Sequence, residues 1–142
     1  MNKTLVKLFL RIGLGAGFLS AVADRLGYWP ANISAWGNWE SFISYTRIIN
    51  PWLPSSFIEP VGLIVTALEI LFGVFLIIGF RTGFIAKLSG YLILIFGLSI
   101  ALSTGIKGAF DYSVFAASGA AFALSKMKGK FLEIDAILKI NP

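Results

Sequence analysis

The stretch "TALEILFGVFLIIGF", residues 66–80, is apolar almost throughout and carries one carboxylate, Glu69. It belongs to a longer apolar segment, residues 61–79, in which 13 of the 19 residues are Leu, Ile, Val or Phe. Together these residues favour insertion into a bilayer by about 4 to 8 kcal/mol, whereas one ionised side chain at mid-helix costs about 2.5 to 3.5 kcal/mol. Insertion therefore remains favourable, and the segment is predicted to cross a membrane with an acid inside it.

The composition extends this prediction to the whole chain. Of its 142 residues, 57% are hydrophobic and 13% are charged, whereas soluble domains are roughly 45–50% apolar and about 25% charged. The sequence has no Cys and no His. Thiol chemistry, thiolate-bound metals and histidine acid–base catalysis are therefore excluded. Any chemistry must use other side chains or belong to a partner, and no metal site is expected.

Four segments are apolar enough for spans, because a bilayer core of about 30 Å needs roughly 20 helical residues. They cover residues 5–26, 61–79, 84–104 and 110–125. The last is short and rich in Ala, Gly and Ser, so it is expected to depend on packing against the others. The predicted fold is all-α, a four-transmembrane-helix bundle that forms a single membrane domain over residues 1–142.

The basic residues predict the orientation of these spans. Eight of them fall on one side of a four-span arrangement: Lys3, Lys7, Arg81, Lys87, Lys126, Lys128, Lys130 and Lys139. Only Arg25, Arg47 and Lys107 fall on the other. The positive-inside rule then places both termini, including the tail 126–142, in the cytoplasm. The same flanking pattern explains the net charge of +5, so we expect no nucleic-acid partner.

The segment "AVA" before Asp24 resembles a signal-peptide cleavage site, since it follows a basic start and an apolar run. Arg11 interrupts that run and glycines dilute it. We therefore expect the first segment to be kept as a span.

The connection between the first two spans, residues 28–58, holds all four tryptophans of the sequence. Within it, "NWESFISYTRIIN" (38–50) places apolar side chains on one helical face and polar ones on the other, which predicts an interfacial amphipathic helix over about residues 38–49. Trp39 and Trp52 are the expected interface residues, since Trp favours the membrane–water boundary. Three roles are possible for this connection: a lid over the bundle, a docking surface for a partner, or a vestibule for an amphiphile. Pro60 is expected to begin the second span.

Glu69 shares a helical face with Gly62, Thr66 and Gly73. Stripes of small residues are where transmembrane helices approach closely, so Glu69 is predicted to point into the bundle. Its expected partner is Arg11 of the first span. Arg11 is roughly 9 Å and Glu69 roughly 15 Å from the cytoplasmic side, at about 1.5 Å per residue, and an extended Arg covers the difference. The alternative for Arg11 is to snorkel to the inner headgroups. Two interpretations stay open: a buried pair that holds the helices in register, and a site that handles a proton, a quinone or another substrate.

Other small-residue stripes predict further packing faces. In the first span the stripe consists of Gly13, Gly17, Ser20 and Asp24, and in the third of Ala86, Gly90, Gly97 and Ala101. Asp24, Arg25 and Asp111 fall near the outer end of the bundle, where charge costs less. Asp111 is expected to cap the fourth helix.

Two stretches of the sequence resemble the DoxX family of small integral membrane proteins, which includes DoxD- and MauE-like relatives. "LFLRIGLGAGFLSAVADRLG" (8–27) is similar to the family's opening helix, and "FIEPVGLIVTALEILFGVFLIIGFRTGFIAKLSGYLILIFGLSIAL" (57–102) to its central block. The resemblance implies a four-helix membrane protein, and it makes Glu69 and Arg11 the residues to carry over. Some relatives partner a second polypeptide in membrane redox systems.

Two functions follow as expectations. The first is a non-catalytic or quinone-proximal subunit of a membrane-associated redox system, rather than an enzyme on its own. A second membrane or peripheral subunit would then hold the redox centres, and quinone is the one cofactor to consider. The second is a small transporter or channel for an ion or organic acid that uses Glu69, in which case a homo-oligomer is expected.

Overall fold

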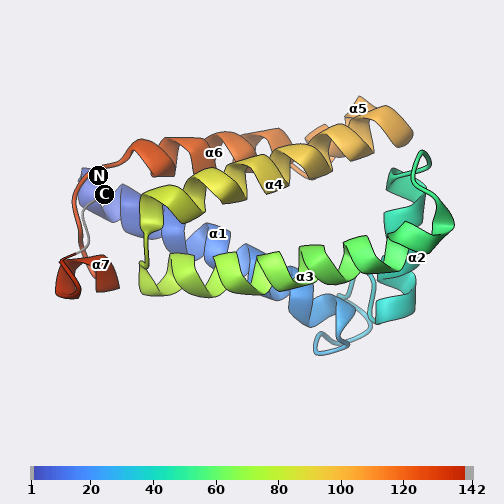
Figure 1. The fold of residues 1–142 in the computed structure, drawn as a ribbon, viewed down its shortest axis with the longest axis horizontal. Coiled ribbons are helices and arrows are strands. Elements are labelled where there is room, and N and C mark those ends of the chain that lie inside the picture. The colour runs from blue at the N-terminus through green and yellow to red at the C-terminus, as the bar shows by residue number, and fades with distance from the viewer. Residues whose placement is uncertain (1, 140–142) are drawn as a thin grey trace.

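The computed structural model describes residues 2–139 and shows seven helices, with no strand in that range. This confirms the all-α prediction. In Figure 1 the long helices lie lengthwise beside one another, with α7 and the start of α1 at one end of the bundle and α2 and α5 at the other. The helices are α1 (Lys3–Arg25), α2 (Trp39–Ile49), α3 (Ser55–Ile78), α4 (Thr82–Ser103), α5 (Ile106–Asp111), α6 (Val114–Lys126) and α7 (Ile134–Ile137).

Three helices, α1, α3 and α4, are long and apolar enough to cross a membrane, with 23, 24 and 22 residues. Helix α6 is apolar but has only 13 residues. At about 1.5 Å per residue it extends about 20 Å, which is less than the bilayer core of about 30 Å. The structure thus has three helices of membrane length and a shorter apolar fourth.

The predicted fourth span, 110–125, is interrupted. Helix α5 ends at Asp111, and Ser113 adopts a left-handed backbone conformation with φ of 54° before α6 begins. The prediction that Asp111 caps this helix is wrong. Asp111 belongs to α5 and pairs with Lys107 at 2.6 Å, and Ser113, which precedes α6, makes no side-chain capping bond. The exposed lysine one turn away is within reach of the carboxylate, whereas α6 starts only after the break.

Pro60 does not begin α3, contrary to prediction, because the helix starts five residues earlier at Ser55, directly after Pro54. Proline lacks the N–H that would pair with the carbonyl four residues back. Near a helix start this removes only one bond, so the second turn accommodates it.

The sides of the long helices expose apolar residues rather than polar ones. Such a lateral surface suits contact with acyl chains, since a water-soluble bundle would cover its outward faces with polar side chains. The exposed residues on α1, α3 and α4 include Leu5, Phe9, Leu63, Ile64, Phe84, Ile95 and Leu102.

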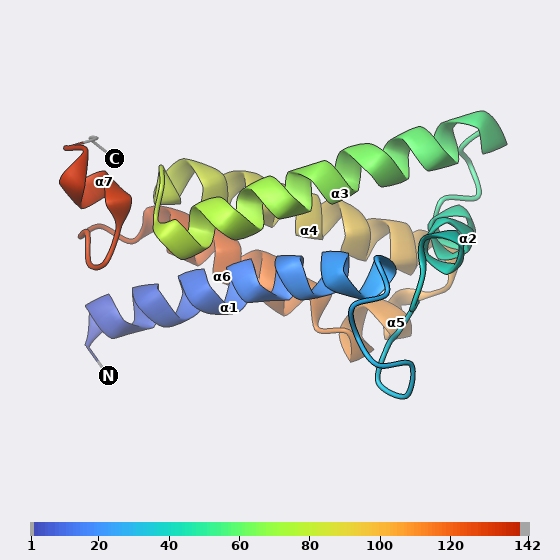
Figure 2. The same ribbon diagram turned by 90° about the horizontal axis from the view of Figure 1, so that it is seen from below.

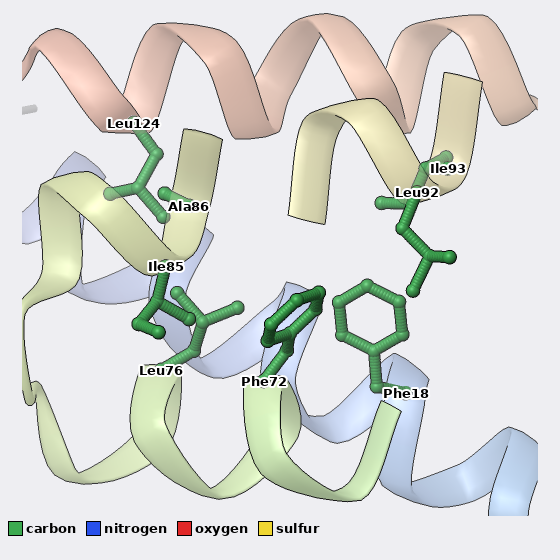
Figure 3. Close-up of a cluster of buried hydrophobic side chains, with 8 residues drawn as sticks. All are labelled: Phe18, Phe72, Leu76, Ile85, Ala86, Leu92, Ile93 and Leu124. Carbon is green, nitrogen blue, oxygen red and sulfur yellow. The ribbon is translucent and has the colours of Figure 1, made fainter. Parts of the chain in front are cut away.

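The buried core lies between α1, α3, α4 and α6 (Figure 3). Phe18 and Phe72 meet edge to face with ring centroids 6.3 Å apart. Leu76 of α3 and Leu124 of α6 are completely buried, and they enter the cluster from opposite sides (Figure 3). The other members are Ile85, Ala86, Leu92 and Ile93.

Helices α1 and α3 run in opposite directions (Figure 2) and approach most closely at Gly15 and Gly73. A Cβ atom on Gly15 would lie 2.8 Å from the carbonyl oxygen of Gly73, and one on Gly73 would lie 2.8 Å from Cγ of Leu19. Backbones can approach this closely only where side chains are missing. The predicted packing role of Gly73 is therefore confirmed, and the contact fixes the register of the two helices.

The small-residue stripe predicted for the first span is wrong in part. Gly13 and Gly17 are exposed, and a Cβ atom added to either would have no neighbour within 4 Å among the described residues, whereas Gly15 makes the close contact. The stripe of α4 is confirmed at Gly90 and Gly97, which pack against Phe122 and Phe115 of α6.

Helix α2 confirms the predicted amphipathic helix. Phe42, Thr46 and Ile49 are buried, and Glu40 and Arg47 on the opposite face are exposed. The buried face packs on α3, where a Cβ atom on Gly62 would lie 2.6 Å from the Ile43 side chain. Of the two tryptophans predicted to lie at the interface, Trp39 is half-buried beside Phe42, at 5.3 Å between centroids, and Trp52 is 52% exposed.

Candidate functional site

The central feature is an ion pair between Arg25, the last residue of α1, and Glu69 in the middle of α3. Arg25 Nη2 lies 2.7 Å from Glu69 Oε2, and the two residues are 1% and 3% exposed. At this distance the guanidinium and the carboxylate form a close contact between opposite charges. The prediction that Glu69 points into the bundle is confirmed.

Further contacts hold the Arg25 guanidinium on all sides. Its Nη1 donates to Thr66 Oγ1 at 2.8 Å, and its Nε donates to the Ala21 carbonyl at 3.2 Å. The guanidinium carbon lies 3.8 Å from the ring centroid of Phe42 and 5.3 Å from that of Trp36. Arginine suits such a site, because its planar group can stack on aromatic rings and donate at its edges. Helix α2 and the loop before it thus cover the guanidinium of the ion pair.

The predicted partner of Glu69 is wrong: Arg11 does not contact it. Arg11 Nε donates to the Leu76 carbonyl at 2.9 Å and Nη2 to the Ile77 carbonyl at 2.8 Å, in the last turn of α3. The Gly15–Gly73 contact places Arg11 opposite that turn, and Glu69 lies two helical turns further along. Carbonyls in a last turn have no intrahelical partner and carry partial negative charge, so they attract a cation.

Arg11 also fastens the C-terminal segment to the bundle. It donates to the carbonyls of Phe131 and Leu132 at 3.0 and 2.9 Å and lies 3.5 Å from Glu133 Oε1. Glu133 pairs in addition with Lys7, at 2.7 Å. Each of the three guanidinium nitrogens thus donates to a backbone carbonyl, and Arg11 is 1% exposed. Arg11 therefore joins α1, the end of α3 and the tail.

Two further buried acids, Glu133 and Asp135, have roles that the sequence pattern did not predict. The Asp135 carboxylate accepts the backbone N–H groups of Arg81 and Thr82 at 2.8 and 3.1 Å, and thereby caps the N-terminus of α4. Glu133 Oε2 accepts the Thr82 hydroxyl at 2.9 Å. One signal could have found them: they are the only two acids in a lysine-rich tail.

Asp24 was predicted to lie on a packing stripe, but it organises the outer loop instead. Its buried carboxylate accepts the Ser34 hydroxyl and the backbone N–H groups of Ala35 and Gly37, at 2.8 and 3.1 Å for the latter two. The neighbouring residues Asp24 and Arg25 therefore act in different places, Asp24 on the loop and Arg25 on Glu69. Asp111, the third charge predicted near this end, is exposed.

Residues 2–139 contain no group of three or more Asp or Glu placed to hold a metal ion. Two shallow, open hollows occur on the surface, and neither is lined by Arg25 or Glu69. The buried acid and base are locked to each other, so the chemistry that this site supports best is the joining of α1, α2 and α3.

A scan against protein-family models, a search of curated proteins and a search of solved structures each found no match. The fold and the site define the chain as a helical protein with three helices of membrane length, two of which, α1 and α3, are joined by a buried Arg–Glu pair.

Proposed function

We propose that this chain is a DoxX-like, four-pass protein of a bacterial or archaeal cytoplasmic membrane and a non-catalytic subunit of a membrane-associated redox system. The resemblance of residues 8–27 and 57–102 to the DoxX family supports this proposal. So does the lack of His and Cys in the sequence, since the redox centres would then have to belong to a partner.

One observation carries the non-catalytic assignment. Glu69, the acid in the middle of a membrane-length helix, is held at 2.7 Å by Arg25 and is 3% exposed. A general acid or base must reach the proton that it transfers. A buried acid that is paired with one cation, itself stacked on Phe42 and Trp36, is better suited to holding helices together than to proton transfer.

In both surface hollows described above, the polar side chains are already engaged by other residues. In the hollow lined by Ser20, Asp24, Trp29, Ile33 and Ala35, Trp29 Nε1 already donates to Ser20, and Asp24 already accepts from the loop. In the other hollow the polar side chain is Glu133, which is engaged by Lys7 and Thr82. We therefore place quinone contact, if the redox system uses one, at the seam with a partner subunit.

Affinity purification of the full chain in a mild detergent, followed by mass spectrometry of proteins and lipids, tests the proposal. We expect a second polypeptide that carries a flavin or a metal centre. The double variant Arg25→Ala/Glu69→Ala should retain this partner if the pair is only structural. A chain that purifies alone, without any redox protein, would contradict the proposal.

A transporter or channel for an ion or organic acid is the second candidate. The observation that favours it is the intramembrane carboxylate itself, since such groups often mark ion and proton pathways. For transport, the Arg25–Glu69 pair would have to open. Proton-coupled flux in vesicles that contain only this chain, abolished in Glu69→Gln, would establish this function in place of the first.

The natural absence of cysteine gives a direct test of orientation. Single replacements Lys128→Cys and Glu40→Cys should react differently with a membrane-impermeant thiol reagent in intact cells. We expect labelling at position 40 only, because the proposed orientation places residue 128 in the cytoplasm. Labelling of both, or of position 128 alone, would exclude this orientation.

A further inference from the structure

The charges of this protein are divided between the two ends of the bundle. We call the end formed by residues 2–11, 79–88 and 126–139 the basic end; α7 and the α3–α4 turn meet there (Figure 1). It holds nine Lys and Arg and two carboxylates, a net charge of +7. Apart from the neutral Arg25–Glu69 pair, the rest of the chain holds two Lys and Arg and four carboxylates, a net charge of −2.

Burial makes the basic end still more positive on its surface. Its two carboxylates, Glu133 and Asp135, are 4% and 6% exposed and are already engaged by Lys7 and by the start of α4. Within residues 2–139, no exposed acid lies at this end. The exposed cations there include Lys3, Arg81, Lys87, Lys126, Lys128 and Lys139.

Apolar side chains lie among these cations. Ile137 is 80% exposed and Leu132 is 68% exposed. With Ile78 at the end of α3, they line an open hollow between that helix and the tail, completed by Glu133, Ile134 and Ala136. In water, exposure of these side chains is unfavourable. Apolar residues beside Lys and Arg are typical of segments that lie at the headgroup level of a membrane.

The tail that carries this surface is fastened to the bundle rather than hanging free. The Asp135 N–H donates to the Gly79 carbonyl at 3.2 Å, in addition to the carboxylate bonds to the α4 start. Arg11 holds the carbonyls of Phe131 and Leu132. The backbone of the tail and the apolar hollow therefore keep their positions relative to the end of α3, which lowers the entropic cost of binding.

We propose that the basic end is a binding site for an anionic phospholipid. The phosphate would lie among the exposed cations of the tail and of the α3–α4 turn, and an acyl chain would lie against Ile78, Leu132 and Ile137. This inference rests on the membrane location in the proposed function, but it does not depend on a redox partner. The cytoplasmic leaflet, where the proposed orientation places this end, is the leaflet rich in anionic lipid.

The choice of lipid over other anions follows from the hollow. A nucleic acid would satisfy the cations but would leave the apolar side chains in water. An anionic lipid satisfies both, because it carries its charge and its hydrocarbon in one molecule. The position of the hollow beside the last residue of a membrane-length helix places it at the level of lipid headgroups.

Native mass spectrometry of the purified full chain, titrated with phosphatidylglycerol or phosphatidylcholine, tests the inference. We expect preferential retention of phosphatidylglycerol. The triple variant Lys126→Gln/Lys128→Gln/Lys139→Gln should weaken its binding at least tenfold, since each cation near an anionic surface contributes on the order of fivefold in affinity. The matched control Arg47→Gln/Lys107→Gln, at the opposite end, should change binding less than about twofold, because neither residue lies near the basic end.

Two further measurements distinguish a direct loss of lipid binding from other effects of the substitutions. Glu40→Cys, introduced into the triple variant and labelled with the impermeant thiol reagent, detects insertion in the wrong orientation. Ile137→Ser, which keeps every cation, should weaken phosphatidylglycerol binding if an acyl chain occupies the hollow. Equal retention of the two lipids, or equal loss in the triple variant and its control, would overturn the inference. A missing redox partner would leave it standing, because no partner is present in the titration.

Discussion

Arg25 Nη2 lies 2.7 Å from Glu69 Oε2, and the guanidinium carbon lies 3.8 Å from the ring centroid of Phe42 in helix α2. The pair brings together the end of the first long helix and the middle of the second. Its burial makes it sensitive to any change that leaves one charge behind, because an isolated charge in a low-dielectric environment is strongly unfavourable.

The first prediction concerns this pair. Arg25→Ala should destabilise the protein by about 3–5 kcal/mol, since Glu69 would remain buried without a cation. The double variant Arg25→Ala/Glu69→Ala should be more stable than Arg25→Ala alone. Thermal or denaturant unfolding in detergent measures both. The exposed Arg47→Ala is the control and should change stability by about 0.5 kcal/mol or less. A double variant no better than the single one would refute the coupling.

The second prediction separates the two arginines of α1. Arg11 and Glu69 share no contact in the structure, so the effects of Arg11→Ala and Glu69→Ala should add within about 0.5 kcal/mol. Arg25 and Glu69 should deviate from additivity by more than about 1 kcal/mol in the same assay. A large coupling energy between Arg11 and Glu69 would instead restore the pairing expected from the sequence.

The third prediction uses two glycines of the same helix. Gly15→Ala should cost about 1–3 kcal/mol, because its Cβ would lie 2.8 Å from the Gly73 carbonyl oxygen, and a backbone atom cannot move aside easily. Gly13→Ala should be neutral or slightly stabilising, because nothing in the described part of the chain lies within 4 Å and alanine favours helix. Unfolding midpoints of the two variants provide the comparison. Equal destabilisation would mean that α1 packs through both faces, as in an oligomer.

The fourth prediction concerns the tail. Asp135→Ala removes the acceptor for the N–H groups of Arg81 and Thr82, and loss of a helix cap costs about 0.5–2 kcal/mol. The segment from Met127 onward should then be cut faster by trypsin, whose lysine sites it contains. Asp111→Ala, at an exposed residue of the opposite end, serves as the control. Unchanged cleavage would show that Glu133 and Arg11 suffice to hold the tail.

Much of the fold follows from the pattern of residues along the chain. The apolar runs predict α1, α3 and α4, because helix length and hydropathy are local properties. The helical spacing of apolar and polar residues over residues 38–49 predicts α2 and its buried face, because this spacing is also a local property. Glu69 was predicted to point inward because Gly62, Thr66 and Gly73 lie on its face, and the structure confirms this.

The fourth predicted span marks where local pattern was insufficient. An apolar composition over residues 110–125 does not reveal that Ser113 takes a left-handed conformation and divides the segment. Similarly, Asp135 caps α4 from more than fifty residues away. Such a cap leaves no trace in the sequence beside the helix that it serves.

The partner of Glu69 depends on contacts between segments far apart in the chain. Counting residues inward from the membrane surface favoured Arg11 by depth alone, and it could not establish the register of two antiparallel helices. The closest approach of backbones, at Gly15 and Gly73, sets that register. It places Arg11 against the free carbonyls of α3 and Arg25 against the acid, so hydropathy specified the helices and close packing specified the pair.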